Sequence, residues 1–386
     1  MAPIYLDHQA TTPCAPEVVH AMAPYWSMEF GNPHSSAHAF GWRADDAIAI
    51  SRGRIAAMVG ADANEIILTS GATEANNLAL LGLLGHNFPE GRNVVVSAIE
   101  HKCVLQAARE LGRRGFEVRM AAVKPSGHVD IENLRSLIDE RTALVSVMLV
   151  NNEIGVVQPI RAIAALCDAA GAVLHCDAAQ APTGAIIDVS ALDVDLLSLS
   201  SHKMYGPKGI GALFVSRGVR SRMRPIIHGG GQEGGLRSGT QPTALCVGFG
   251  EAARIVRERV LIDADHLRNV RGVFLDALLA RVPDAEVNGA EPKHPGQLNL
   301  RIPGVEAEML VANLQPHLAI STGAACSSGI PEPSHVLRAI GLDGEAAGQC
   351  VRIGFGRAVG VEIASEAARL LIGAIEGIRS SLDPIL

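Results

Sequence analysis

The sequence predicts an α/β fold in which a large domain, with a mostly parallel sheet flanked by helices, precedes a smaller α/β domain. In the first part of the chain, short apolar runs typical of buried strands alternate with helical patterns. Strands separated by helices of about 10–15 residues form βαβ units, and these units build a parallel sheet. After about residue 240 the helical patterns become longer, which indicates a second domain.

Each element is expected from such a pattern. The strands of the large domain are predicted at residues 65–69, 93–98, 117–123, 143–150, 172–177, 195–200 and 211–215, and helices between them at residues 74–84, 104–114, 131–140 and 160–170. Further on we expect helices at residues 245–260, 263–281, 306–314 and 361–381, and strands at residues 297–302 and 351–355. We place the large domain at residues 15–254 and the small domain at residues 255–386, with residues 1–14 packed on the small domain.

Composition restricts the class of protein. The chain has 386 residues, of which 48% are apolar and 19% charged, so it can bury a sizeable core and is not disordered. Its net charge of −7 argues against a nucleic-acid surface, which is normally basic. No basic segment typical of a signal peptide and no long apolar run typical of a membrane span occurs. The seven cysteines, odd in number and without C-x-x-C spacing, argue against a disulfide framework or a zinc ribbon and favour the cytoplasm.

The strongest local signal is a lysine at the end of an apolar strand. Residues 196–201 lead directly into His202 and Lys203, and a turn rich in Gly and Pro follows. The chain has only five lysines against 28 arginines, so a lysine at this position is noteworthy. A partly desolvated lysine at the rim of a sheet has a lowered pKa and forms a Schiff base with a carbonyl compound or with pyridoxal phosphate (PLP). A surface lysine that starts a loop is the alternative.

Two further segments predict ligand contacts at strand ends. Asp177 ends an apolar strand, where open α/β sheets bind ligands, and such an acid keeps a PLP pyridine nitrogen protonated. Gln180, three residues later, is within reach of the ring oxygen, although a helix N-cap is the alternative for Asp177. Residues 68–77 contain a strand, a Gly turn and Thr73 at the start of a helix, which predicts either an anion site or an ordinary capped turn. Residues 229–234 match G-x-G-x-x-G but continue as a loop, so no dinucleotide site is expected.

Cys326 differs from the other cysteines in its surroundings. It lies among Gly, Ala and Ser residues after a short apolar strand, whereas the other six lie mostly in apolar or helical patterns. Free cysteines in such patterns behave as small buried hydrophobes. A thiol on a Gly/Ser-rich loop is placed to attack a sulfur atom and pass it on by exchange, unless it is an accidental exposed thiol.

Taken together and in this order, these segments resemble the cysteine desulfurases of the NifS/IscS kind, fold-type I PLP enzymes of the class V aminotransferases. The resemblance extends over essentially the whole chain. It is carried by residues 5–13, 30–33, 69–74, 100–101, 151–157, 201–203 and 237–240, by the loop around Cys326, and by Arg352.

The resemblance implies a role for each site residue. Lys203 would hold PLP covalently and then act as acid and base on the substrate α-proton. Cys326 would attack the substrate sulfur, and His101 would stack on the ring and relay protons. No metal is implied in the PLP site, although Cys326 would be able to contact a nascent iron–sulfur cluster. The remaining contacts would be Asp177 and Gln180 to the ring, Ala72, Thr73, Ser200, His202 and the partner subunit's Thr240 to the phosphate, and Asn152 and Arg352 to the substrate carboxylate.

The implied activity is conversion of L-cysteine to L-alanine by a homodimer, with transfer of sulfur as a Cys326 persulfide to an acceptor protein. Iron–sulfur cluster assembly, tRNA thiolation and DNA phosphorothioation are the candidate routes, without direct contact to nucleic acid or membrane. A selenocysteine lyase or an aminotransferase on the same fold is one alternative. A sulfur-relay protein that is active only with a partner is another.

Overall fold

A seven-stranded sheet forms the centre of the large domain in the computed structural model, which describes residues 3–84, 91–322 and 334–382. The strand order is β2-β8-β7-β6-β5-β3-β4. β8 is antiparallel to both of its neighbours and the other pairs are parallel, which confirms the prediction of a mostly parallel sheet. The strands are β2 (Ile66–Thr69), β3 (Asn93–Ser97), β4 (Glu117–Ala121), β5 (Thr142–Ser146), β6 (Val173–Asp177), β7 (Leu196–Ser200) and β8 (Gly211–Val215).

Most strands of this sheet are buried along their whole length, which explains why they read as continuous apolar runs. The edge strand β4 is the exception, because most of its residues are partly or fully exposed. The strand predicted at residues 143–150 ends at Ser146 in the structure. The chain continues alongside β6 as a buried segment, with Val147 N–H donating to His175 O at 3.1 Å and Leu149 N–H to Asp177 O at 2.9 Å.

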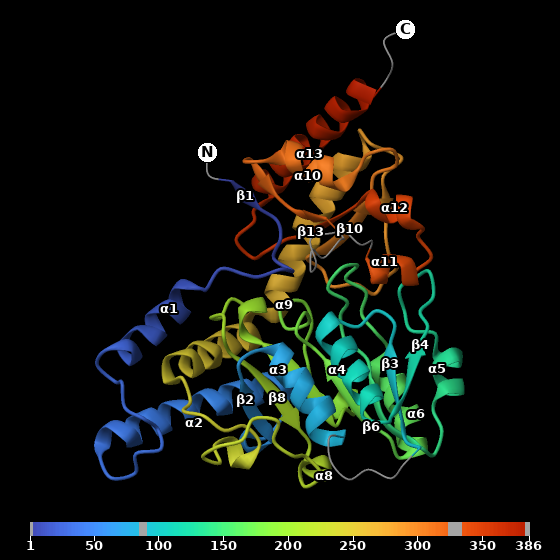
Figure 1. The fold of residues 1–386 in the computed structure, drawn as a ribbon. Helices are drawn as coiled ribbons and strands as arrows, with labels where there is room; N and C mark the ends of the chain where they lie inside the picture. Colours follow the sequence, from blue (N-terminus) through green and yellow to red (C-terminus); the bar gives the residue numbers. More distant parts are fainter. Residues whose placement is uncertain (1–2, 85–90, 323–333, 383–386) are drawn as a thin grey trace.

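The helices between the strands cover the two faces of the sheet (Figure 1). α6 (Ile160–Ala170) has the predicted bounds, and α4 (Lys102–Arg113) and α5 (Ile131–Leu137) differ from them at their ends. The helix predicted at residues 74–84 begins earlier, as α3 (Ala72–Asn77), and continues as a π-helical turn at Leu78–Gly82. Two short helices, α7 (Val189–Leu192) and α8 (Arg217–Arg220), complete this part of the chain.

One continuous helix, α9 (Thr243–Leu279), replaces the two helices predicted at residues 245–260 and 263–281. Figure 1 shows it running from the large domain into the small one. Its residues up to Val256 pack in the core of the large sheet, and Leu267, Val270, Phe274 and Leu278 pack in the second core. Because neither Gly nor Pro separates the two segments, nothing in the backbone ends the helix between them.

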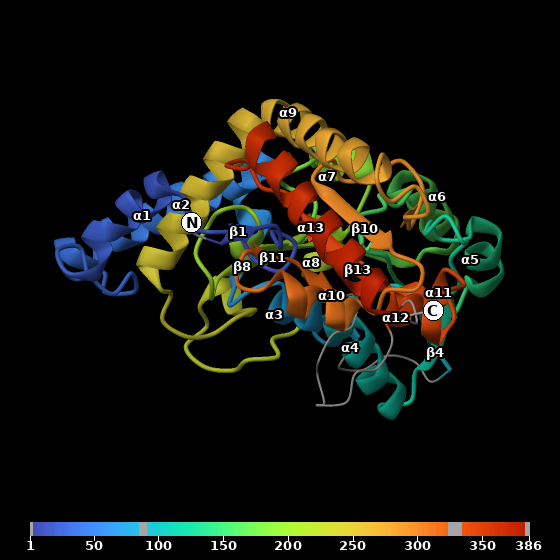
Figure 2. The ribbon, with the colours of Figure 1, turned by 90° about the horizontal axis from the view of Figure 1, so that it is seen from above.

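The second core surrounds an antiparallel sheet of order β12-β13-β10-β9. Figure 2 shows α13 lying across β10 and β13. The N-terminal segment joins this part of the molecule, because β1 (Ile4–Tyr5) pairs with β11 (Leu318–Ala319) and Leu6 is buried in the same core. Its other elements are β9 (Glu286–Val287), β10 (Gln297–Arg301), β12 (Ser321–Thr322), β13 (Cys350–Gly354), α10 (Ala307–Leu314), α11 (His335–Ala339), α12 (Gly344–Gly348) and α13 (Val361–Leu382).

Two N-terminal helices have no counterpart in the sequence prediction. α1 (Pro16–Met22) and α2 (Ala39–Val59) pack on the N-terminal half of α9, and the segment that joins them projects from the body of the molecule (Figure 1). No helix in the described ranges is long and apolar enough to cross a membrane.

Candidate active site

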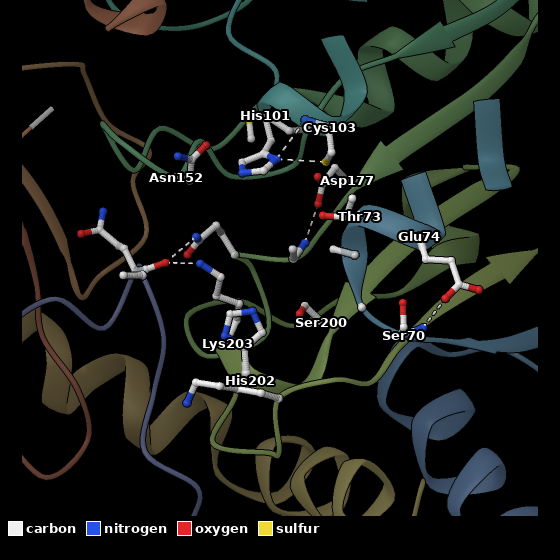
Figure 3. A pocket seen from close by; sticks show the side chains of 18 of the residues that line it. Ser70, Thr73, Glu74, His101, Cys103, Asn152, Asp177, Ser200, His202 and Lys203 are labelled. Carbon is white, nitrogen blue, oxygen red and sulfur yellow. Dashed lines mark hydrogen bonds between the residues drawn. The ribbon is translucent and has the colours of Figure 1, made fainter. Parts of the chain in front are cut away.

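A cavity of about 590 Å³ lies at the carboxyl ends of β6 and β7, where the large domain meets Arg352 of the small one. Figure 3 shows the side chains that converge on it. Thr240 is exposed and does not line this cavity, and Cys326 lies outside the described residues. The cavity brings together the other ten residues singled out from the sequence: Ala72, Thr73, His101, Asn152, Asp177, Gln180, Ser200, His202, Lys203 and Arg352.

Lys203 enters the cavity from a short 3₁₀ turn, Ser201–Lys203, that directly follows β7. Its ammonium nitrogen donates a hydrogen bond to the main-chain oxygen of Gln9. Burial, reinforced by the nearby charge of Arg352, lowers the pKa of Lys203 to about 8. The alternative of a simple surface lysine is therefore wrong, and a useful fraction of the amine is neutral near neutral pH.

Asp177 is the last residue of β6 and is only 4% exposed. Its Oδ2 accepts a hydrogen bond from Asn76 Nδ2 at 2.7 Å, and its Oδ1 accepts one from the Ala179 N–H at 2.9 Å. No helix begins after Asp177, so the alternative of a helix N-cap is wrong. The two donors fix a carboxylate at the floor of the cavity, where it can pair with a positively charged ring nitrogen.

His101 is the N-cap of α4, and this position aims its imidazole into the cavity. Its Nδ1 accepts from the main-chain N–H of Cys103 at 3.2 Å and lies 2.9 Å from the thiol sulfur of the same residue. Partial burial lowers the pKa of His101, with Asp177 acting against this shift and Lys203 adding to it. At neutral pH the ring is thus mainly neutral and able to exchange protons.

The part of the cavity that suits an anion lies between β2 and α3. Gly71 has φ +144°, a backbone conformation that favours glycine, and it turns the chain so that α3 begins with Ala72 and Thr73. Their N–H groups are among the first of the helix and have no helical partner of their own. His202 is nearby; burial and the charge of Lys203 lower its pKa to about 4, so this imidazole is neutral.

Arg352 reaches the cavity from β13 and is held by a residue that the sequence analysis assigned no role. Its Nη2 pairs with Asp7 Oδ1 at 2.9 Å, and its Nη1 lies 3.4 Å from the main-chain oxygen of Asn152. Asp7 stands within the motif of residues 5–13, but 345 positions separate it from Arg352. No local pattern predicts their contact.

Two other residues of the cavity have contacts that the sequence analysis did not predict. Gln180 lines the cavity, but its amide is engaged with the protein: Nε2 donates to Gln9 O at 2.9 Å and Oε1 accepts from Gln297 Nε2 at 3.0 Å. Cys103 is not simply a small buried hydrophobe in a helical pattern, because it lines the cavity beside His101. Its position two residues after His101 was the signal that could have identified it.

The residues present fit PLP. A lysine of lowered pKa, a buried carboxylate and an imidazole surround the cavity, and free N–H groups at the start of α3 suit a phosphate. Buried polar atoms with no partner in the described structure also occur on residues that line the cavity: Arg352 Nε and both amide atoms of Gln9. Because unpaired buried polar atoms are costly, their concentration beside one cavity indicates that a polar ligand belongs there.

Comparison with known proteins agrees with this chemistry. The aminotransferase class-V family model matches residues 4–362. Cysteine desulfurase IscS of Rickettsia bellii (strain OSU 85-389) is 45% identical over 384 residues, which cover 99% of this chain and 93% of that protein. A solved structure of a NifS-like protein has a TM-score of 0.90 at 32% identity and covers 98% of this chain and 100% of its own. A structure of SspA in complex with cysteine has a TM-score of 0.81 at 36% identity and covers 91% and 98%, respectively.

These matches extend over nearly the whole length of the chain and include the residues that form the cavity. The chain therefore belongs to the aminotransferase class-V family, among its cysteine desulfurases.

Proposed function

We propose that this enzyme takes sulfur from L-cysteine, leaves L-alanine, and holds the sulfur as a persulfide on Cys326 before passing it to an acceptor protein. The observation that carries this proposal is the convergence of Lys203, Asp177 and His101 on one cavity with Arg352 at its rim. When bound, PLP supplies an electron sink that stabilises negative charge developing on the substrate.

Each side chain has a task that its geometry supports. Arg352, already oriented by Asp7, is to bind the substrate carboxylate together with Asn152. Lys203 is to bind the cofactor and to move the α-proton, because its lowered pKa makes the neutral amine accessible. His101 would exchange a proton with the substrate, because its lowered pKa keeps the imidazole mainly neutral.

Sulfur transfer itself is assigned to Cys326. The thiolate attacks the substrate sulfur, a sulfur–sulfur bond forms, and the carbon–sulfur bond breaks, so that the former substrate keeps the electron pair and is protonated to alanine. The described residues on either side of Cys326 support this assignment. Thr322 lies on β12, which pairs with β13 and its Arg352, and Ser334, before α11, contacts Glu153, next to Asn152.

The active unit is proposed to be a homodimer. The projecting segment around the start of α2 exposes a cluster of large apolar side chains, and such a cluster on a protein surface is typical of an interface. Thr240, exposed and outside the cavity of its own chain, is then available to the phosphate of the partner's site. The exposed cluster consists of Trp26, Met28, Phe30, Phe40 and Trp42.

The acceptor is proposed to be a protein of iron–sulfur cluster assembly or of a thiolation route. The relative at 45% identity is named a cysteine desulfurase IscS, which favours the first route. A cytoplasmic location, expected from the pattern of cysteines, is part of this proposal.

The test is brief exposure of the PLP-loaded enzyme to L-cysteine without reductant, followed by mass spectrometry and measurement of alanine. We expect a persulfide on Cys326 and an equal amount of alanine. Cys326→Ser should abolish both, whereas Cys14→Ser, a matched change at another free thiol, should abolish neither. An active Cys326→Ser enzyme would favour an aminotransferase, and turnover only after addition of an acceptor would favour the relay protein.

A further inference from the structure

The thiol of Cys103 connects two residues of the active site that do not touch each other. Cys103 lies in the first turn of α4, two residues after the His101 N-cap, and its sulfur is 2.9 Å from Nδ1 of that histidine. On its other side the sulfur accepts a hydrogen bond from Asn76 Nδ2 at 3.1 Å. The same Asn76 nitrogen donates to Asp177 Oδ2 at 2.7 Å, so one line of hydrogen bonds runs from Asp177 to His101. Figure 3 shows its last contact, between Cys103 and His101.

The carboxylate of Asp177 determines which group donates and which accepts in each hydrogen bond of this line. A carboxylate oxygen only accepts, so the amide group that faces Asp177 must be the NH₂ group of Asn76. Its second hydrogen then points to the sulfur of Cys103, which accepts it. The S–H of Cys103 is left to donate to His101 Nδ1.

His101 Nδ1 consequently faces two donors, the S–H and the main-chain N–H of the same cysteine. A ring nitrogen that faces two donors carries no proton, and the ring hydrogen lies on Nε2. Burial raises the pKa of the Cys103 thiol to about 12, and Asp177 reinforces this shift, so the thiol keeps its proton.

We propose that Cys103 is a positioning residue that holds His101 neutral, with its proton on Nε2, and that Asn76 transmits this orientation from Asp177. The proposal rests on the proposed role of His101 in proton exchange. In this proposal Cys103 donates a hydrogen bond to His101, and it does not accept sulfur from the substrate. Donation to Nδ1 stabilises the neutral ring, so loss of the thiol raises the pKa of His101.

The test is titration of the ring nitrogens of His101 by nuclear magnetic resonance in the PLP-loaded full-length enzyme, with the signals assigned by their loss in His101→Gln. Lys102, Asp177, Lys203 and His335 also face this ring electrostatically and are left unchanged in every variant. In Cys103→Ala we expect the midpoint to rise by about half to one pH unit, as expected for loss of one hydrogen bond. Cys103→Ser, whose hydroxyl also donates, should restore the lower midpoint.

The pH dependence of kcat should change in the same direction as the pKa of His101. In Cys103→Ala the acidic limb of the profile of kcat against pH should move upward with the midpoint, and kcat near neutrality should fall by up to about threefold with little change in KM. Cys14→Ala, the same change at a free thiol that does not line the cavity, should alter neither the midpoint nor the profile.

An unchanged midpoint in Cys103→Ala, a Cys103→Ser variant no better than Cys103→Ala, or a persulfide on Cys103 would each overturn the proposal. The titration is read without substrate. An absence of alanine formation in the unsubstituted enzyme would therefore count against the proposed function and leave this test intact.

Discussion

Burial and the charges around Lys203 set the pKa of its amine, and the size of the pKa shift allows a quantitative prediction. Its pKa is lowered to about 8, from an ordinary 10.5, first by burial and next by Arg352, while Asp7 and Asp177 act in the opposite direction. A shift of this size increases the neutral amine roughly 300-fold at pH 7, to about one molecule in ten. Because only the neutral amine attacks the PLP aldehyde, covalent attachment of PLP to the apoenzyme should accelerate with pH and level off above about pH 8.

The perturbation that tests this cause is Arg352→Gln. Removal of the guanidinium deletes the second cause of the shift, so the midpoint should rise, by roughly one pH unit for a charge at this range, and attachment at pH 7 should slow about tenfold. Asp7→Asn should have the opposite effect, because it removes a charge that raises the pKa of Lys203 and frees Arg352 from its ion pair.

The assay is the change in cofactor absorbance after mixing apoenzyme with PLP, followed at a series of pH values. Titration of PLP itself is common to all the proteins and cancels in the comparison. Lys203→Ala, which has no amine at this position, should give reversible binding alone. A wild-type midpoint near 10.5, or a downward shift in Arg352→Gln, would refute the reasoning.

Three further outcomes are expected. Lys203→Met should stabilise the PLP-free protein at pH 7 by up to about 3 kcal/mol in urea unfolding, because a lysine with a folded pKa of about 8 and an unfolded pKa of 10.5 destabilises the fold below pH 8. The stability difference between the variant and the unsubstituted protein should vanish towards pH 10.5. Glu233→Gln should cost roughly 3 kcal/mol in the same measurement, because it leaves Arg52, which is paired at 2.6 Å, without its buried partner. Asp177→Asn should lower kcat by about 100-fold or more with PLP still bound, since the amide cannot balance a positive ring nitrogen; steady-state kinetics on protein of measured PLP content decides this.

The parts of the site that lie on the large sheet were predictable from the sequence, because buried parallel strands read as uninterrupted apolar runs and their ends share one edge. Asp177 is the last residue of β6 and Lys203 follows the neighbouring strand β7, so the strand order explains why they lie close together. The pair of Asp7 and Arg352 was not predictable in this way, because it joins the two ends of the chain through β1, β11 and the second sheet.

The helices that were missed or divided have a common physical cause. A sequence pattern reveals a helix when apolar residues keep to one face, but α2 exposes Phe40, Trp42 and Ile50 while burying others. In α9, Leu261 and Ile262 are both more than 60% exposed and interrupt the pattern where two helices were predicted. Apolar side chains on an exposed face obscure the helical signal and at the same time mark surface available to a partner.

The N-terminal segment links the two halves of the site, and this has a consequence for catalysis. Gln9 offers its main-chain oxygen to Lys203, and Asp7, two residues earlier, holds Arg352. In the absence of substrate, Arg352 helps to keep Lys203 neutral and ready to attack. A substrate carboxylate bound to Arg352 brings a negative charge that offsets this effect, so the pKa of the released Lys203 amine should rise and the amine becomes a stronger base. Binding of the substrate carboxylate to Arg352 thus makes Lys203 a stronger base for the proton transfer that follows. A saturating concentration of an unreactive carboxylate compound should therefore raise the pKa of Lys203 in the absorbance assay.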